Sequence, residues 1–342
     1  MRCGRNRRWR PNRSQLPTHE ALPHIALASY PRSGNTLLRS LIEQRCHTIT
    51  GSDMKVDEHA KTLFMARRLR SLGLQGEGIS DDRVWMVKTH FPERTGPVFA
   101  PVRMHGAIVL VRNPCDAVDS LWNMRRTKSH TRSVWPLAYT LARDEWQSQL
   151  RAEAKKWAAF LQFWQQTDAC FVRFEDLLNV QRREPTLRRI AQYLCDMVPE
   201  SQRPSARAVL ADLLDGQTTT SADGGPLASV AAKSVYIPRR GTVGHSLRHF
   251  GADDRAAVAE GCGGLMRAFG YNDDPRSDSF SNDVVAADAP LPPAWPQTED
   301  SVLIHGAPAV MCLANGIMIN GDASMTRPGL SEAREAGGTT AQ

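Results

Sequence analysis

Residues with the chemistry to bind an anion are gathered near the start of this chain. Residues 30–36 read YPRSGNT and combine an arginine, the hydroxyl side chains of Ser33 and Thr36, and a glycine. The apolar run 25–28 precedes them, and leucines at helical spacing follow. Such a strand, loop and helix point the first backbone N–H groups of the helix, and the positive end of its dipole, into one space. The segment therefore predicts a site for phosphate or a similar anion, although an ordinary strand-to-helix turn has the same pattern.

Two further apolar runs are followed directly by basic residues. Residues 84–87 (VWMV) predict a strand buried on both faces, and Lys88 and His90 come after it. Residues 107–111 predict a second buried strand, which ends at Arg112. The carboxyl ends of parallel strands meet at one edge of a sheet, so these side chains are expected to converge there.

A helix and a distant loop add polar groups to the same edge. Asn113 can cap a helix and Pro114 can occupy its first position, and this helix carries Ser120 eight residues after Arg112. A fourth basic segment contains Arg239 and Gly241. Convergence of four such segments favours an anion site over a solvated charge pair.

The elements that must position these groups alternate along the chain. Helical patterns are predicted at 63–72, 137–166, 185–195 and 265–271, and a third buried strand at 169–172. No hairpin signal interrupts the alternation, so the fold class is α/β, with a central parallel sheet flanked by helices. One apolar stripe in the longest helix is assigned to core packing: Leu150, Ala154, Trp157, Leu161 and Trp164.

The composition indicates which kinds of partner and site the protein can have. The 342 residues carry a net charge of +7, which suits anionic partners such as nucleotides, nucleic acid or acidic polysaccharide. The N-terminal arginines lack interleaved aromatic residues beyond Trp9, which indicates a basic tail and not a nucleic-acid reader. The 7 cysteines are never spaced as C-x-x-C, so we expect reduced thiols and no metal site.

Three segments are expected along the chain. Residues 1–22 are predicted to be a disordered basic segment, 23–271 the folded domain, and 272–342 a mostly disordered tail in which residues 310–319 can dock. No apolar run of about 18 residues is present, so no membrane span is expected. We expect a cytoplasmic protein if the chain is complete, and one of the Golgi lumen if an anchor is missing from it.

Five sequence blocks carry a resemblance to a known family. YPRSGNT resembles the 5′-phosphosulfate-binding loop of the sulfotransferases that use 3′-phosphoadenosine 5′-phosphosulfate (PAPS). IVLVRNPCDAVDS is similar to their 3′-phosphate-binding strand and helix, and VKTHFP to their catalytic K-T-H segment. VRFEDLL and RRGTVGHSLRHF resemble two later blocks of the family. The transferase domain is most similar to the PRSGNT group that includes WSC-domain sulfotransferases, and the resemblance implies a three-layer P-loop-like fold.

The resemblance also implies residue roles. The PAPS-binding set would be Arg32, Ser33, Gly34, Asn35, Thr36, Arg112, Ser120, Phe174, Arg239, Arg240 and Gly241. His90 would take the proton from an acceptor hydroxyl, while Lys88 and Arg32 would neutralise charge during sulfuryl transfer, without a metal. The implied acceptor is a small molecule or a glycan, with a carbohydrate hydroxyl favoured.

Several positions depart from the family pattern. Arg32 stands where many members have lysine, Leu37 replaces a tryptophan that stacks on adenine, and the pair His245 and Ser246 replaces another motif. Phe174 is the aromatic residue left to contact adenine. Because of these departures, a relative that binds the nucleotide without catalysing transfer remains an alternative.

A P-loop nucleotide kinase is disfavoured because G-x-x-x-x-G-K-[ST] is absent. A structural role at a helix start is expected for the acidic pair in VRFEDLL.

Overall fold

The computed structural model describes residues 22–56, 60–71, 73–129, 132–215, 243–280, 311–313 and 316–319. Its strands are β1 (Ile25–Ser29), β2 (Gly51–Ser52), β3 (Met86–Thr89), β4 (Val102–Met104), β5 (Gly106–Val111), β6 (Ala169–Arg173), β7 (Met311–Leu313) and β8 (Gly316–Ile319). The longer helices are α1 (Asn35–Cys46), α2 (Ala60–Ser71), α3 (Pro114–Thr127), α5 (Arg143–Gln165), α7 (Val180–Asp196) and α11 (Ala252–Cys262). Short helices are α4 (Leu137–Leu141), α6 (Phe174–Leu178), η1 (Glu200–Gln202), α8 (Arg203–Val209), α9 (Ala211–Leu214), η2 (His245–His249) and α12 (Leu265–Ala268).

The central sheet is parallel and has the strand order β2-β3-β1-β5-β6. Its middle strands are apolar on both faces, because helices cover both, and all five residues of β1 are buried. The predicted α/β fold with a central parallel sheet is confirmed. One strand is displaced from its prediction, since β3 begins at Met86 and not at residue 84, so Lys88 and Thr89 lie within the strand.

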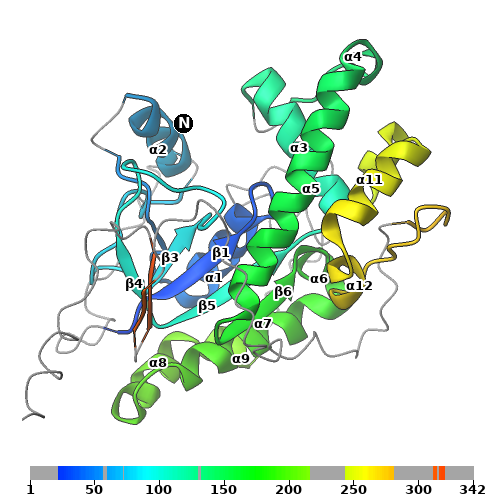
Figure 1. Ribbon diagram of the computed structural model, residues 1–342. Helices are drawn as coiled ribbons and strands as arrows, with labels where there is room; N and C mark the ends of the chain where they lie inside the picture. The colour runs from blue at the N-terminus through cyan, green and yellow to red at the C-terminus, as the bar shows by residue number, and fades with distance from the viewer. Residues whose placement is uncertain are drawn as a thin grey trace, which may run out of the picture.

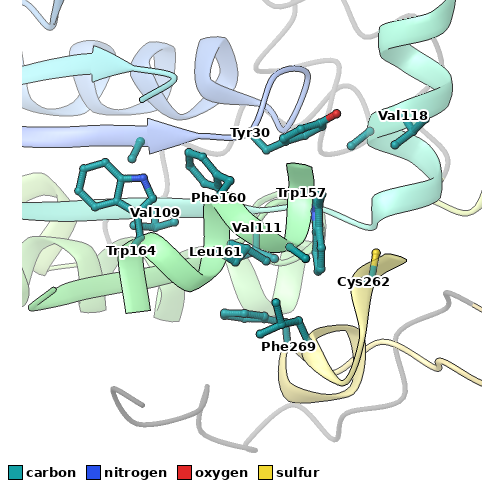
Figure 2. Close-up of a cluster of buried hydrophobic side chains, with 14 of the residues drawn as sticks. Tyr30, Val109, Val111, Val118, Trp157, Phe160, Leu161, Trp164, Cys262 and Phe269 are labelled. Atoms are coloured by element: carbon teal, nitrogen blue, oxygen red, sulfur yellow. The ribbon is translucent and has the colours of Figure 1, made fainter. Parts of the chain in front are cut away.

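Two layers of helices enclose the sheet (Figure 1). Apolar residues of α1 and α7 pack on one face, together with Leu27 and Ile108 of the sheet. Residues of α3, α5 and α11 pack on the other face, against Ala26 and Val109. The predicted stripe of α5 lies in this second core, where Trp157, Leu161 and Trp164 are at most 1% exposed (Figure 2).

The helices differ from the sequence prediction in several places; for example, α2 begins at Ala60 and α12 ends at Ala268. The long pattern at 137–166 is interrupted at Ala142, which separates α4 from α5. Helix α7 begins at Val180 and not at Pro185, because the Asn179 side chain accepts hydrogen bonds from the first free N–H groups and the helix continues through the proline. Helix α11 was not predicted, since its alanine-rich sequence carries little apolar periodicity.

Packing continues past the end predicted for the folded domain at residue 271. Phe280 is fully buried in the core beside α11 and α12. Strand β8 pairs antiparallel with β4, and β7 pairs with β8, so part of the predicted docking segment 310–319 forms a small second sheet. Among the described residues, no helix is both long and apolar enough to cross a membrane.

Candidate active site

The loop between β1 and α1 has a backbone shaped for close approach. Arg32 and Gly34 both adopt positive φ angles, 71° and 99°. The Ser33 N–H closes the turn by donating to the Tyr30 carbonyl at 3.1 Å. Gly34 is the N-cap of α1, and the N–H groups of Asn35 and Thr36 lie in the first turn of the helix, where the helix itself offers no acceptor. This end of α1 therefore presents backbone donors and the positive end of a dipole.

Position 34 requires glycine because of a neighbouring aromatic ring as well as because of the φ angle. A Cβ atom at this position would lie 2.1 Å from Cδ2 of Phe174. Phe174 is 3% exposed at the start of α6, so its ring has no room to retreat. The ring supports the loop, and its contact with adenine stays a prediction.

Predicted residues from three elements are in direct contact. The Arg32 Nε donates to the Ser120 Oγ of α3 at 3.1 Å, and Arg112 donates to the Arg32 carbonyl at 2.7 Å. The Arg112 guanidinium also lies 4.7 Å from the centre of the Phe174 ring. Trp157 of α5 donates to the Arg112 carbonyl at 3.0 Å. The edge formed by β1, β5 and α3 is thus one connected cationic surface.

Two buried donors at this surface have no hydrogen-bond partner within the part of the chain that the structure describes. They are the Ser33 Oγ and the Arg112 Nε. Burying a polar atom without a partner costs about 1–3 kcal/mol. Anionic groups seated along this surface would satisfy these donors, which fits the phosphate-binding roles predicted for Ser33 and Arg112.

His90 lies just beyond β3 and is oriented by the end of β1. Its Nδ1 is 2.7 Å from the Ser29 carbonyl oxygen, an atom that only accepts, so Nδ1 carries the ring proton. Nε2 is then left with its lone pair. Burial lowers the pKa of His90 well below its usual value, and Lys88 and Arg94 lower it further. The ring is therefore a neutral base near pH 7.

Lys88 is half-buried in a charged surrounding. Burial lowers the pKa of its ammonium, Glu77 and Asp53 act in the opposite direction, and Arg39 and Arg94 act with burial. Lys88 pairs in register with Leu27, whose side chain belongs to the core beneath α1, so Lys88 points toward the same face. Lys88 therefore lies on the sheet face that α1 covers, and His90 directly follows the end of β3.

The neighbouring Asn35 ties α1 to the end of β1. Its amide nitrogen donates to the Leu27 carbonyl at 2.7 Å and to the Ser29 Oγ at 3.2 Å. The same Ser29 therefore contacts both the helix that follows the anion loop and the ring of His90. Sequence patterns did not single out Ser29, because a small residue at the end of a buried strand carries no periodic signal.

The acidic pair of VRFEDLL is structural, as predicted. Glu175 accepts from the Asn113 N–H at 3.0 Å and from the Tyr271 hydroxyl at 2.8 Å. Burial raises the pKa of Glu175. Asp176 pairs with Arg173 and not with a reacting group. Glu175 thus secures the start of α3 behind Arg112.

A second carboxylate links α3 to the segment that follows the fourth basic loop. Asp116 accepts from the Gly244 N–H at 2.8 Å, and from the backbone and hydroxyl of Ser246 at 3.2 and 2.6 Å. Ser246, which departs from the family pattern, is therefore a partner of α3. Arg239, Arg240 and Gly241 lie outside the described residues, and their roles stay predictions. In the described part of the chain, no cluster of acidic, histidine or cysteine side chains is arranged to hold a metal ion.

Comparison with known proteins places this site in a family. The profile of the sulfotransferase domain matches residues 22–195, just over half of the chain, and this match covers β1 through α7. The chain belongs to the sulfotransferase domain family.

The sulfotransferase domain also has curated relatives in insects. A WSCD family member of Drosophila pseudoobscura pseudoobscura is 32% identical over 180 residues, which are 52% of each chain. A WSCD family member of Drosophila melanogaster is 31% identical over 180 residues, 51% of each chain. The chain spans about half the length of the curated relatives it matches. A solved structure, mouse sulfotransferase SULT7A1 complexed with PAP, shares 16% identity over 72% of this chain and 84% of that chain, with a TM-score of 0.38.

Proposed function

We propose that this protein transfers a sulfuryl group from PAPS to an acceptor hydroxyl, with a carbohydrate as the favoured acceptor class. The observation that carries the proposal is the joining of Arg32, Ser120 and Arg112 around a helix N-terminus, with a neutral histidine at the adjoining strand end. The family match supports the reaction class.

The PAPS molecule would lie along the connected cationic surface. The first-turn amides of α1 and the Ser33 hydroxyl would hold its 5′-phosphate. Arg112 and Ser120 would hold the 3′-phosphate at the far end of the same surface. Arg32 already donates to Ser120, so its guanidinium joins the two ends.

Transfer then needs one proton acceptor and one site for developing negative charge. Nε2 of His90 takes the acceptor proton while the acceptor oxygen forms a bond to sulfur. The bond from sulfur to the bridging oxygen breaks, and its electron pair stays on the phosphate of adenosine 3′,5′-bisphosphate. The Lys88 ammonium hydrogen-bonds the oxygen where that charge develops, which stabilises the transition state.

The test is transfer of labelled sulfate from PAPS to a panel of sugars and phenols. We expect transfer to a sugar hydroxyl by the native chain, and loss of transfer with retained bisphosphate binding in His90→Ala. Thermal stabilisation by adenosine 3′,5′-bisphosphate without any transfer would instead establish a binding-only protein. Stabilisation by ATP and magnesium alone would contradict the sulfotransferase proposal.

A further inference from the structure

A buried carboxylate lies behind the candidate site, with no role in the mechanism above. Glu77 is 0% exposed, and one of its oxygens is paired with the Arg39 guanidinium of α1. Its other oxygen, Oε2, has no partner at hydrogen-bond geometry among the described residues. A carboxylate that is removed from water and only half satisfied is costly unless another cation lies close.

The backbone holds Glu77 firmly in this position. Arg70 donates to its carbonyl at 2.5 Å. The preceding Gly76 lies so close to the Thr50 carbonyl that a Cβ atom would come within 2.1 Å of it. Arg39 in turn is anchored to Thr50 through its Nε at 2.7 Å and a terminal nitrogen at 2.9 Å. The carboxylate is therefore fixed by α1, by α2 and by the segment beside β2.

The second cation is Lys88, on the sheet face that packs against α1. Strand β2 pairs with β3 so that Ser52 lies beside Lys88, and the segment that carries Glu77 is bonded to Ser52 through the Ile79 carbonyl at 2.9 Å. Arg39 and Lys88 together outweigh burial and lower the pKa of Glu77. The Ser52 hydroxyl, which belongs to the residue beside Lys88 in the strand register, also lowers the pKa of Glu77.

The remaining charged neighbours of Lys88 do not replace Glu77. Asp53 is on the other side of the strand pair, where it accepts from the Thr89 hydroxyl at 2.7 Å. Arg39 and Arg94 are cations and favour loss of the Lys88 proton, and the neighbouring His90 is neutral. Glu77 is thus the group that most strongly opposes the effect of burial on this lysine.

We propose that Glu77 is a positioning residue, which holds the Lys88 ammonium in place and in its protonated form on the sheet face that α1 covers. This inference rests on the proposed function for its catalytic meaning, since a protonated Lys88 is what the leaving oxygen requires. Arg39 has a supporting part, because it is paired with the Glu77 carboxylate and fixes its position.

The test compares Glu77→Gln with the native chain in two measurements. The first is the titration of Lys88 followed by carbon NMR of labelled lysine, which is practical because the chain has only 7 lysines. Gln keeps an oxygen for Arg39 but loses the charge, so the Lys88 pKa should fall by about one pH unit. The second is the pH dependence of kcat, whose basic limb should move to lower pH by the same amount, with about a tenfold loss of kcat above it.

Two further variants separate positioning from simple loss of structure. Glu43→Gln is the matched control, since Glu43 bonds to Thr50 in the same network but is not among the groups that act most strongly on Lys88. It should leave the Lys88 titration and the basic limb unchanged. Glu77→Asp restores the charge and should move the limb back toward its native position.

An unchanged Lys88 titration in both Glu77 variants would overturn the inference, whatever their stability. If the native chain transfers no sulfate, the proposed function fails, while the lysine titration still decides whether Glu77 holds Lys88.

Discussion

A histidine whose Nδ1 faces a carbonyl oxygen must keep its ring proton on that nitrogen. In His90 the Ser29 carbonyl imposes this choice, and burial, Lys88 and Arg94 together keep the ring neutral. The proposed base is therefore neutral before any substrate arrives. The position of its ring proton depends on one backbone carbonyl and does not require an acidic partner.

The pH dependence of kcat/KM should reveal this neutral base. Because the folded protein lowers the pKa of His90, the ring stays unprotonated to a pH below the usual value of about 6.5, so the acidic limb should lie below that pH. His90→Gln should remove this limb and reduce kcat by about 10²–10⁴-fold. An acidic limb that persists in His90→Gln would assign the proton acceptor to another group.

Gly34 offers a second prediction at the scale of one residue. Gly34→Ala should weaken binding of adenosine 3′,5′-bisphosphate and destabilise the fold, because it combines an unfavourable φ angle with a collision against Phe174. The backbone part alone is worth about 1–3 kcal/mol. Calorimetric titration and urea denaturation measure the two effects.

Gly96→Ala is the matched control for this substitution. Gly96 also has a positive φ angle, 116°, but nothing lies within 4 Å of a Cβ atom there. It should show only the backbone cost and leave binding unchanged. Equal losses of stability in the two variants would mean that the Phe174 ring moves aside freely.

Among the helices and strands, α3 positions several parts of the candidate site. Its first turn secures Arg112 through Asn113 and Glu175, its second turn presents Ser120 to Arg32, and Asp116 binds the start of η2. The segment bound by Asp116 directly follows the fourth basic loop in the sequence. Helix α3 therefore connects the two ends of the proposed nucleotide site.

Removal of the Asp116 carboxylate should loosen this connection. Asp116→Ala leaves two backbone N–H groups and one hydroxyl without their acceptor, so we expect a loss of about 1–3 kcal/mol in the free energy of unfolding. Ser246→Ala removes only one of the three bonds and should cost about 1 kcal/mol. Urea denaturation compares them, and equal stability of Asp116→Ala and the native chain would contradict the assigned contact.

Elements with strong local signals were predictable from the sequence, and those fixed by distant partners were not. The middle strands, the cap of α3 and the tryptophan stripe of α5 follow from apolar runs, Asn113 and helical spacing. Strand β2 has two residues and exists only because β3 lies beside it, so no periodicity marks it.

The same distinction holds within the candidate site. Arg32, His90 and Arg112 follow the ends of predictable strands, and Ser120 lies in the helix that begins after Arg112, which is why motif spacing located them. Glu77 lies in an irregular segment, and its proposed role depends on Lys88, which the fold brings into its neighbourhood. Single-sequence patterns carry no information about such a contact.

For the whole molecule, the second sheet shows that the packed body extends far beyond the stretch matched by the sulfotransferase profile. Strand β8 covers the edge of β4, and Ile319 is fully buried in the larger core. Val102 and Met104 of β4 are at most 4% exposed. An uncovered strand edge with apolar side chains favours association between chains.

A chain ending after residue 310 should therefore be less stable and prone to self-association. A chain ending after residue 320 is the control, because it keeps both β7 and β8. Thermal denaturation and sedimentation velocity compare the two. Identical melting temperatures and monomeric behaviour would show that the second sheet contributes nothing to stability in solution.

The end of β1 also bears on how such a protein can change over evolutionary time. Ser29 orients the histidine, and the next residues form the proposed anion loop, so in the proposed mechanism one short stretch of backbone serves both donor binding and proton removal. A mutation that shifts this strand disturbs both functions together and is removed by selection. New acceptors are therefore expected to arise by change in the segments around this edge, while the strand itself stays constant.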